Sequence, residues 1–221
     1  MTIQSINPTD GTPLERFEPM DSATLTARLE TAGRAASDWV RQPLSRRTEL
    51  LTRLAALLRQ RRASLALLMT REMGKLIGEA EAEIDKCVLV CEHYAEHAGA
   101  YLADEVIASD AGRSLVACQP LGTVLAVMPW NFPFWQLFRC AAPALAAGNP
   151  VLLKHASNVP GCALAIEALF RDAQAPEGVF ATLLIGSDAV ESVIAHPAVR
   201  AVSLTGSDAA GARSRPSLAR I

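Results

Sequence analysis

Asn131 is the first residue whose surroundings could support chemistry. It stands in the segment 129–133, Pro-Trp-Asn-Phe-Pro, which follows a β-branched run and precedes an apolar helical pattern. Two prolines restrict the backbone of this turn and therefore fix the direction of the Asn131 amide. An amide N–H held at a strand end can stabilise a developing oxyanion. The spacing leaves open a second interpretation, in which Asn131 only caps the following helix.

Lys154 places a cation at the end of the next predicted strand, where His155, Ala156 and Ser157 follow it. Ligands of open α/β sheets bind at the carboxyl ends of the strands, so an ammonium group here can bind a ribose or a phosphate. The alternative is a solvated lysine that only ends a strand.

A third group follows the last predicted strand, where Thr205, Gly206 and Ser207 precede the start of a helix. Gly206 lets a phosphate approach the backbone, and the free N–H groups of a helix N-terminus favour its charge. The alternative is that Ser207 caps only its own helix. Two familiar phosphate-binding sequences are absent: no G-x-G-x-x-G follows the first strand of this region, and Ala212 stands where a P-loop would have its lysine.

The elements that carry these three groups form an alternating pattern. From residue 121 onward, short β-branched runs alternate with apolar helical segments, which is typical of βαβ units. We predict an α/β fold with a doubly wound, Rossmann-like parallel sheet. The predicted strands are 123–128, 150–154, 180–185 and 201–204, and the predicted helices are 134–147, 159–173 and 188–195.

The first half of the chain is predicted to be helical after a polar leader that ends near Asp21. Leucines spaced three and four residues apart predict amphipathic helices. The predicted helices are 22–40, 45–73 and 78–102, and an extended stretch is predicted at 114–119.

Composition excludes several classes of partner. The 221 residues carry 21 Lys and Arg against 23 Asp and Glu, a net charge of −2, so no basic field exists to attract nucleic acid. No apolar run reaches the roughly 18 residues that span a bilayer, and residues 1–12 do not resemble a signal peptide. We therefore expect a cytoplasmic protein without membrane or nucleic-acid partners.

The five cysteines form no C-x-x-C pair and lie in apolar stretches, which predicts reduced thiols. Cys87, Cys91, His93 and His97 are the one cluster with metal-like spacing. On a helix the two cysteines share a face, while the histidines lie about 120° further round. These four side chains cannot close one tetrahedral site, so we expect no metal centre.

Taken together, the three strand ends resemble the aldehyde dehydrogenase superfamily. Its hallmarks include Pro-Trp-Asn-Phe-Pro, a lysine at the end of the next strand, and a strand that leads into Thr-Gly-Ser. All three occur here in that order, and the resemblance covers residues 3 to about 211. Further segments that resemble the family are Asn7-Pro8, 72–75, 119–122 and 143–149.

The resemblance implies a mechanism and roles for several residues. In the family, a cysteine thiolate attacks the aldehyde, hydride passes to the nicotinamide, and a glutamate-activated water releases the acid. Asn131 matches the oxyanion-stabilising asparagine, and Pro129 and Trp130 match backbone that lines the cofactor. Lys154 matches the ligand of the adenosine ribose, and Gly206 with Ser207 matches the pyrophosphate site.

Ser157 bears on the choice between NAD and NADP. Strictly NAD-dependent relatives often have a glutamate at this position, whose carboxylate binds the ribose hydroxyls and repels a 2′-phosphate. Because a serine removes that repulsion, we expect NADP to be accepted as well as NAD.

Residues 153–158 resemble the bacterial succinate-semialdehyde dehydrogenase branch of the family. Arg139 falls where members of that branch place a cation near the substrate carboxylate, and a guanidinium can bind a carboxylate through two hydrogen bonds. The alternatives for Arg139 are a surface charge or a structural ion pair. By this resemblance, the expected substrate is an aldehyde, and more specifically a semialdehyde such as succinate semialdehyde.

The resemblance also sets expectations for the extent of the chain. Residues 1–211 match the N-terminal part of the NAD(P)-binding domain, in which about 110–120 would form a strand of the oligomerisation hairpin. We expect residues 212–221, with Pro216, to be an aberrant tail. The family's catalytic cysteine, its Glu-Leu-Gly-Gly glutamate base and its catalytic domain are not found, so we expect the chain to be inactive alone.

The family's enzymes imply a homo-oligomeric parent, while oligomerisation of this chain is left open. Two alternatives to an enzyme remain at this point: a non-catalytic nucleotide-binding fragment, and the non-functional product of a frameshifted gene.

Overall fold

The computed structural model describes residues 2–212. Within this range, the central sheet has four parallel strands in the order β7-β6-β5-β8. The chain runs outward from β5 to β7 and then returns to place β8 beside β5, so the strand order reverses between β5 and β8. Ligands of open α/β sheets bind at such a reversal. The strands are β5 (Thr123–Met128), β6 (Val151–His155), β7 (Phe180–Thr182) and β8 (Val199–Leu204).

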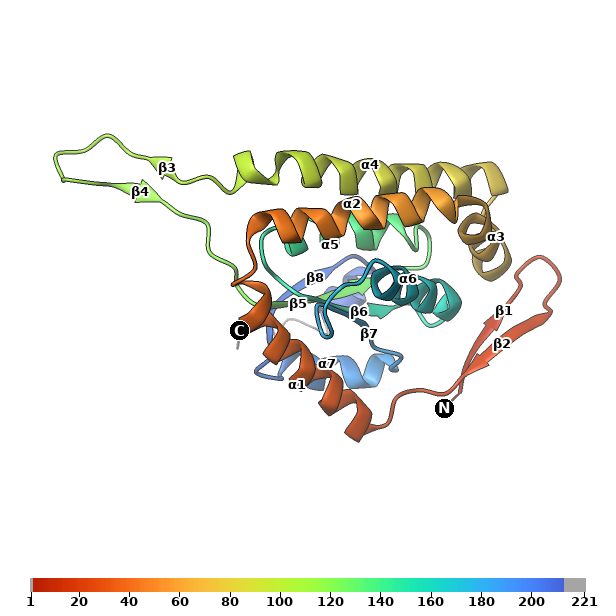
Figure 1. Cartoon of the computed structure of the whole chain (residues 1–221). Coiled ribbons are helices and arrows are strands. Elements are labelled where there is room, and N and C mark those ends of the chain that lie inside the picture. The colour runs from red at the N-terminus through yellow and green to blue at the C-terminus, as the bar shows by residue number, and fades with distance from the viewer. Residues whose placement is uncertain (1, 213–221) are drawn as a thin grey trace.

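Helices cover both faces of this sheet (Figure 1). Ala126 and Leu153, which are partners in the β5–β6 register, pack into the core beneath α5 (Trp135–Ala146) and α6 (Pro160–Asp172). The preceding partners, Leu125 and Leu152, face the core on the opposite side of the sheet, together with residues of α1 (Ser22–Trp39) and α7 (Val190–Ile194). A short 3₁₀ turn, η1 (Ser187–Ala189), directly precedes α7. Burial on both faces explains why the strands are almost continuously apolar.

An outer helical layer lies over α5. It consists of α2 (Leu44–Gln60), α3 (Arg62–Met73) and α4 (Ile77–Tyr101), and Figure 1 shows α2 and α4 side by side. Leu50, Leu54 and Leu58 are fully buried on one stripe of α2, as their spacing predicts.

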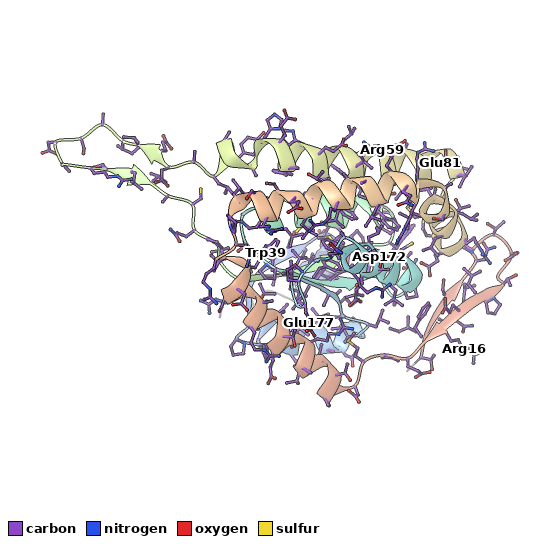
Figure 2. The ribbon with its side chains drawn as sticks, in the orientation of Figure 1. Arg16, Trp39, Arg59, Glu81, Asp172 and Glu177 are labelled. Carbon is purple, nitrogen blue, oxygen red and sulfur yellow. The ribbon has the colours of Figure 1, made fainter. Side chains whose placement is uncertain are left out.

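The single helix predicted for 45–73 is wrong, because the chain breaks at Arg61 into α2 and α3. Arg61 leaves helical geometry with φ −100° and ψ 11°. Its side chain pairs at 2.7 Å with Asp172. Asp172 is the last residue of α6 and is labelled in Figure 2, and α3 turns to pack against α6. No glycine or proline marks this break, since it follows from tertiary packing.

The leader was predicted without regular structure, but it contains an antiparallel hairpin of β1 (Ile3–Ile6) and β2 (Pro13–Phe17). Gly11 adopts φ +75° in the connecting turn, a conformation that favours glycine. Leu14 and Phe17 of β2 are three positions apart instead of two, so the strand lacks the alternating pattern by which to recognise it.

A second hairpin projects from the body of the molecule (Figure 1). It pairs β3 (Glu105–Val106) with β4 (Leu115–Val116), so the strand predicted within 114–119 is confined to two residues. Strand β7 is also shorter than predicted, because regular pairing stops at Thr182. Most of the predicted aberrant tail, 213–221, lies outside the described residues. None of the helices in the described part of the chain is both long and apolar enough to cross a membrane.

Candidate cofactor and oxyanion site

The three groups singled out in the sequence meet at one edge of the sheet. Lys154 of β6 and Leu204 of β8 are both in register with Val127 of β5. The Thr205 amide continues the ladder by donating to the Val127 carbonyl at 3.0 Å. The Asn131 turn, the end of β6 and the Thr205–Ser207 segment are therefore neighbours at the carboxyl ends of the strands.

The backbone beside Asn131 is held by a buried ion pair. Lys75 donates to the Asn131 carbonyl at 3.1 Å and pairs with the Glu83 carboxylate. Oε1 of Glu83 accepts hydrogen bonds from the amides of Phe134 and Trp135, each at 2.9 Å. Glu83 thus caps α5, and no side-chain hydrogen bond of Asn131 does so. This excludes the interpretation in which Asn131 is the helix cap.

His155 fastens the end of β6 to the same turn. Its Nδ1 accepts from the Ala156 amide at 2.9 Å, so Nε2 carries the proton and donates to the Pro133 carbonyl, also at 2.9 Å. Burial lowers the pKa of His155 to about 4, and the ring is therefore neutral near pH 7.

Lys154 provides a partly desolvated cation beside this turn. It lies two residues from Leu152 and so projects toward the face of the sheet that α1 and α7 cover. Burial lowers the pKa of its ammonium group, and it forms no ion pair with any residue of 2–212. Ser157, three residues on, is exposed. An ammonium group that is partly removed from water and has no ion-pair partner within residues 2–212 can bind the hydroxyls or the phosphate of a nucleotide.

Carboxylates of the protein itself occupy two nearby helix N-termini. Glu83 caps α5, and Glu72 accepts from the amides of Gly161 and Cys162 at the start of α6, at 2.9 and 2.7 Å. By contrast, no carboxylate among the described residues accepts from the amides of residues 206–208. Among residues 2–212, the helical segments that follow β5 and β6 have a carboxylate at their first amides, whereas the segment that follows β8 has none, which suits an external anion.

Ser207 begins this last helical segment, 208–212, and its Oγ accepts from the Ala210 amide at 3.3 Å. It therefore serves as a cap, as one interpretation of the sequence held, through a long hydrogen bond. Within residues 2–212, a Cβ added at Gly206 would meet only the side chains of Ala210 and Leu204, both at 3.8 Å, apart from its immediate chain neighbours. No described atom crowds this backbone, so the residues present fit the approach of a phosphate.

The profile of the aldehyde dehydrogenase family matches residues 1–217. The chain belongs to this family. Its sequence is 51% identical over 212 residues to a protein from Synechocystis sp. named "Probable succinate-semialdehyde dehydrogenase [NADP(+)]". The matched residues make up 96% of this chain and 47% of that relative. A succinate-semialdehyde dehydrogenase, NADP(+), from Deinococcus radiodurans is 41% identical, with 94% of this chain and 44% of the relative covered.

Solved structures of the family have the same fold as this chain. The structure of succinic semialdehyde dehydrogenase from Streptococcus pyogenes with NADP+ superposes with a TM-score of 0.96 at 36% identity, covering 99% of this chain and 48% of that chain. The predicted α/β class, helical first and then a Rossmann-like parallel sheet, is confirmed. The chain spans about half the length of the curated relatives it matches.

Arg139 lies exposed one turn into α5 of this aldehyde dehydrogenase chain. It forms no ion pair with the residues that the structure describes, so the alternative of a structural ion pair finds no support. A surface charge and a substrate ligand both remain compatible with its position.

Four of the five cysteines are poorly suited to nucleophilic chemistry. Burial raises the pKa of Cys87, Cys91 and Cys162 well above that of an ordinary thiol, and raises the pKa of Cys140 as well. Cys118 is exposed, and it lies in the segment between β4 and β5. Within residues 2–212, no group of three or more His, Cys, Asp and Glu side chains is placed to hold a metal ion.

Sequence reasoning missed Lys75, Glu72, Glu83 and His155 as parts of the site. One signal could have found Glu83, which lies on the buried stripe of α4 with Ala80 and Cys87. A carboxylate on an apolar stripe must find polar partners, because burial of an unpaired charge is costly.

Proposed function

We propose that this chain binds NADP and supplies the oxyanion donor for NAD(P)-dependent oxidation of an aldehyde to a carboxylic acid. The observation that carries the proposal is the meeting of the Asn131 turn, Lys154 and the Thr205–Ser207 segment where the strand order reverses. A semialdehyde such as succinate semialdehyde is the proposed substrate, since relatives from Synechocystis and Deinococcus carry that name.

The proposal gives each residue one task. Lys154 and Ser157 bind the adenosine ribose and its 2′-phosphate, Gly206 and Ser207 bind the pyrophosphate, and the backbone of 129–130 lines the cofactor. The bound nicotinamide supplies the two-electron oxidant. NAD is the alternative cofactor, because a serine at position 157 can also donate to an unphosphorylated ribose.

Two residues act on the substrate in this proposal. Asn131 donates its side-chain N–H to the oxygen on which negative charge develops, and its exposed position leaves that group open. Arg139 pairs with the second carboxylate of the semialdehyde. No cysteine or glutamate of this chain stands in the motifs that hold the family's nucleophile and base, so the proposal assigns neither.

A non-catalytic nucleotide-binding role is the second candidate, and the buried cysteines favour it for this chain alone. Succinate semialdehyde added with NADP to this chain alone should form no NADPH above a blank, because the proposal assigns it neither nucleophile nor base, and measurable turnover would contradict the non-catalytic role. The proposal includes a cytoplasmic location, which suits unpaired cysteines, a homo-oligomeric parent, and no nucleic-acid partner.

Titration of the purified chain with NADP and with NAD, followed by tryptophan fluorescence or calorimetry, tests the cofactor assignment. Ser157→Glu places a carboxylate against the 2′-phosphate. A charge contact of about 1 to 3 kcal/mol should therefore shift the ratio of the two dissociation constants toward NAD by about 5- to 150-fold. Lys154→Ala should weaken binding of both cofactors, and NADP more.

Ser64→Glu, on the exposed surface of α3, adds the same charge away from the proposed site and should leave the ratio unchanged. A ratio that Ser157→Glu does not move would show that the ribose lies elsewhere. Failure of the wild-type chain to bind either dinucleotide would overturn the proposed function.

A further inference from the structure

A buried ion pair lies beneath the turn that carries Asn131. Lys75 and Glu83 are 7% and 3% exposed, so both charges have been removed from water. Replacing a buried ion pair with apolar side chains is often neutral or even stabilising for a fold. The pair is therefore best understood through the backbone that it holds.

Its contacts fall on consecutive residues of the turn. The Lys75 ammonium donates to the carbonyl of Asn131 at 3.1 Å and lies 3.5 Å from the centroid of the Phe132 ring. Glu83 then accepts from the amides of Phe134 and Trp135.

The residue between these two contacts, Pro133, is held by His155 through its carbonyl. Each residue from 131 to 135 thus has at least one specific contact to a distant part of the chain.

These contacts come from the outer helical layer, far away in the chain. Lys75 follows α3 through Gly74, whose φ of +75° ends that helix, and Glu83 lies in α4. Lys75 is 56 residues from Asn131, and Glu83 is 51 residues from Phe134. The α3–α4 connection and the first part of α4 are therefore in direct contact with the turn at the carboxyl ends of the strands.

We propose that Lys75 and Glu83 are positioning residues for Asn131. The pair fixes the Asn131 peptide and the start of α5, so that only the side-chain torsions of Asn131 remain to be set. A donor that is held in place before reaction needs no reorganisation when charge develops, which is the basis of oxyanion stabilisation. This inference rests on the proposed function for the role of Asn131.

A purely structural role, in which Glu83 only caps α5, predicts a different response to mutation. Glu83→Gln keeps an oxygen that can accept from the two amides but removes the charge that pairs with Lys75. A cap alone would then leave Asn131 unaffected. Lys75→Met removes the donor to the Asn131 carbonyl, and Lys75→Arg restores a charged donor.

Arg62→Met is the matched control. Arg62 binds Asp85 through two hydrogen bonds, at 2.8 and 2.9 Å, and so joins the same two helices at the surface. Its loss removes a cation between α3 and α4 without removing a contact to the turn.

The test is NMR on the full chain without cofactor. It follows ¹⁵N relaxation of the Asn131 side-chain amide, assigned by Asn131→Asp, and hydrogen exchange at Phe134 and Trp135. In Lys75→Met we expect exchange at least about tenfold faster than in wild type and a mobile Asn131 side chain, with recovery in Lys75→Arg. In Glu83→Gln we expect the mobile Asn131 with both amides still protected.

The proposal is overturned if Asn131 in Lys75→Met and Glu83→Gln relaxes as it does in Arg62→Met. Should Lys75→Met fail to fold, Glu83→Gln against Arg62→Met decides the question by the same comparison. The NADP titration of the wild-type chain is independent of this result, so a failure of the proposed function and a failure of the positioning role are told apart.

Discussion

At the scale of single residues, the site depends on polar groups that are buried and fully partnered. Lys75, Glu72, Glu83 and His155 are each less than a tenth exposed, and every one of them bonds to backbone atoms of another element. Asn131 and Ser157, which are proposed to touch ligands, are exposed instead, and Lys154 is partly buried. The four buried residues thus hold the backbone on which these ligand-binding side chains stand.

His155 makes the stability of the chain depend on pH. Because its folded pKa of about 4 lies below the unfolded value of 6.5, the unfolded chain binds a proton between these values while the folded chain does not. Stability should therefore fall as pH falls from 6.5 to about 4, by up to about 1.4 kcal/mol per pH unit.

His155→Gln retains an amide donor for the Pro133 carbonyl and removes this titration. Urea unfolding of both proteins should show wild type losing about 2 kcal/mol more than the variant between pH 7 and pH 5. Carboxylates titrate in both and cancel in the difference. Equal losses would mean that His155 is protonated in the folded chain.

At the scale of elements, carboxylates from the outer helices define which helix ends can bind an anion. Glu72 lies in the last turn of α3 and caps α6, while Glu83 lies on α4 and caps α5. The amides that follow β8 receive no such carboxylate from the described residues. The open helix end and the proposed pyrophosphate position therefore coincide.

We expect Glu72→Ala to destabilise the chain by about 2 to 4 kcal/mol, because the buried amide of Cys162 and the partly buried amide of Gly161 both lose their acceptor. Glu72→Gln should lose less, since one oxygen remains. Glu79→Ala, an exposed glutamate in the first turn of α4, serves as the control and should change stability by less than about 0.5 kcal/mol.

The free energy of unfolding in urea gives the comparison for these three variants. A loss for Glu72→Ala no larger than that for Glu79→Ala would show that water replaces the carboxylate at the start of α6.

At the scale of the molecule, a compact body with a sheet between two helical layers carries one projecting arm (Figure 1). The arm is the β3–β4 hairpin, where Val106 and Val116 are 79% and 57% exposed. Isolated two-stranded hairpins with exposed apolar side chains gain little stability in water. A role in association between subunits, which the family resemblance predicts, accounts for such an arm and stays a prediction.

The double variant Val106→Thr with Val116→Thr tests this prediction. Because both side chains are exposed, its free energy of unfolding at low protein concentration should stay within about 0.5 kcal/mol of wild type. Sedimentation velocity at rising concentration should show weaker self-association than wild type. A large loss of stability, or association that is unchanged, would remove the hairpin from the interface.

Local signals in the sequence determined much of the fold. A β-branched run between Gly122 and Pro129 predicted β5 at its observed bounds, and alternating apolar helices predicted α5 and α6 to within a residue. Once strands and helices alternate in this way, the right-handed connections of a parallel sheet bring the strand ends to one edge. Asn131, Lys154 and the Thr205–Ser207 segment were therefore found together from sequence.

Contacts between distant residues were decided only by the tertiary structure. The break at Arg61 accompanies the packing of α3 against α6, and the contacts of Lys75 and Glu83 with residues 131–135 join positions more than 50 apart. No glycine or proline marks the break, and the buried stripe of α4 indicates that Glu83 needs polar partners but not which backbone it contacts. The free energy of these contacts exists only after the layers have packed. Sequence thus determined which groups reach the site, whereas packing of the outer helices decided how their backbone is held.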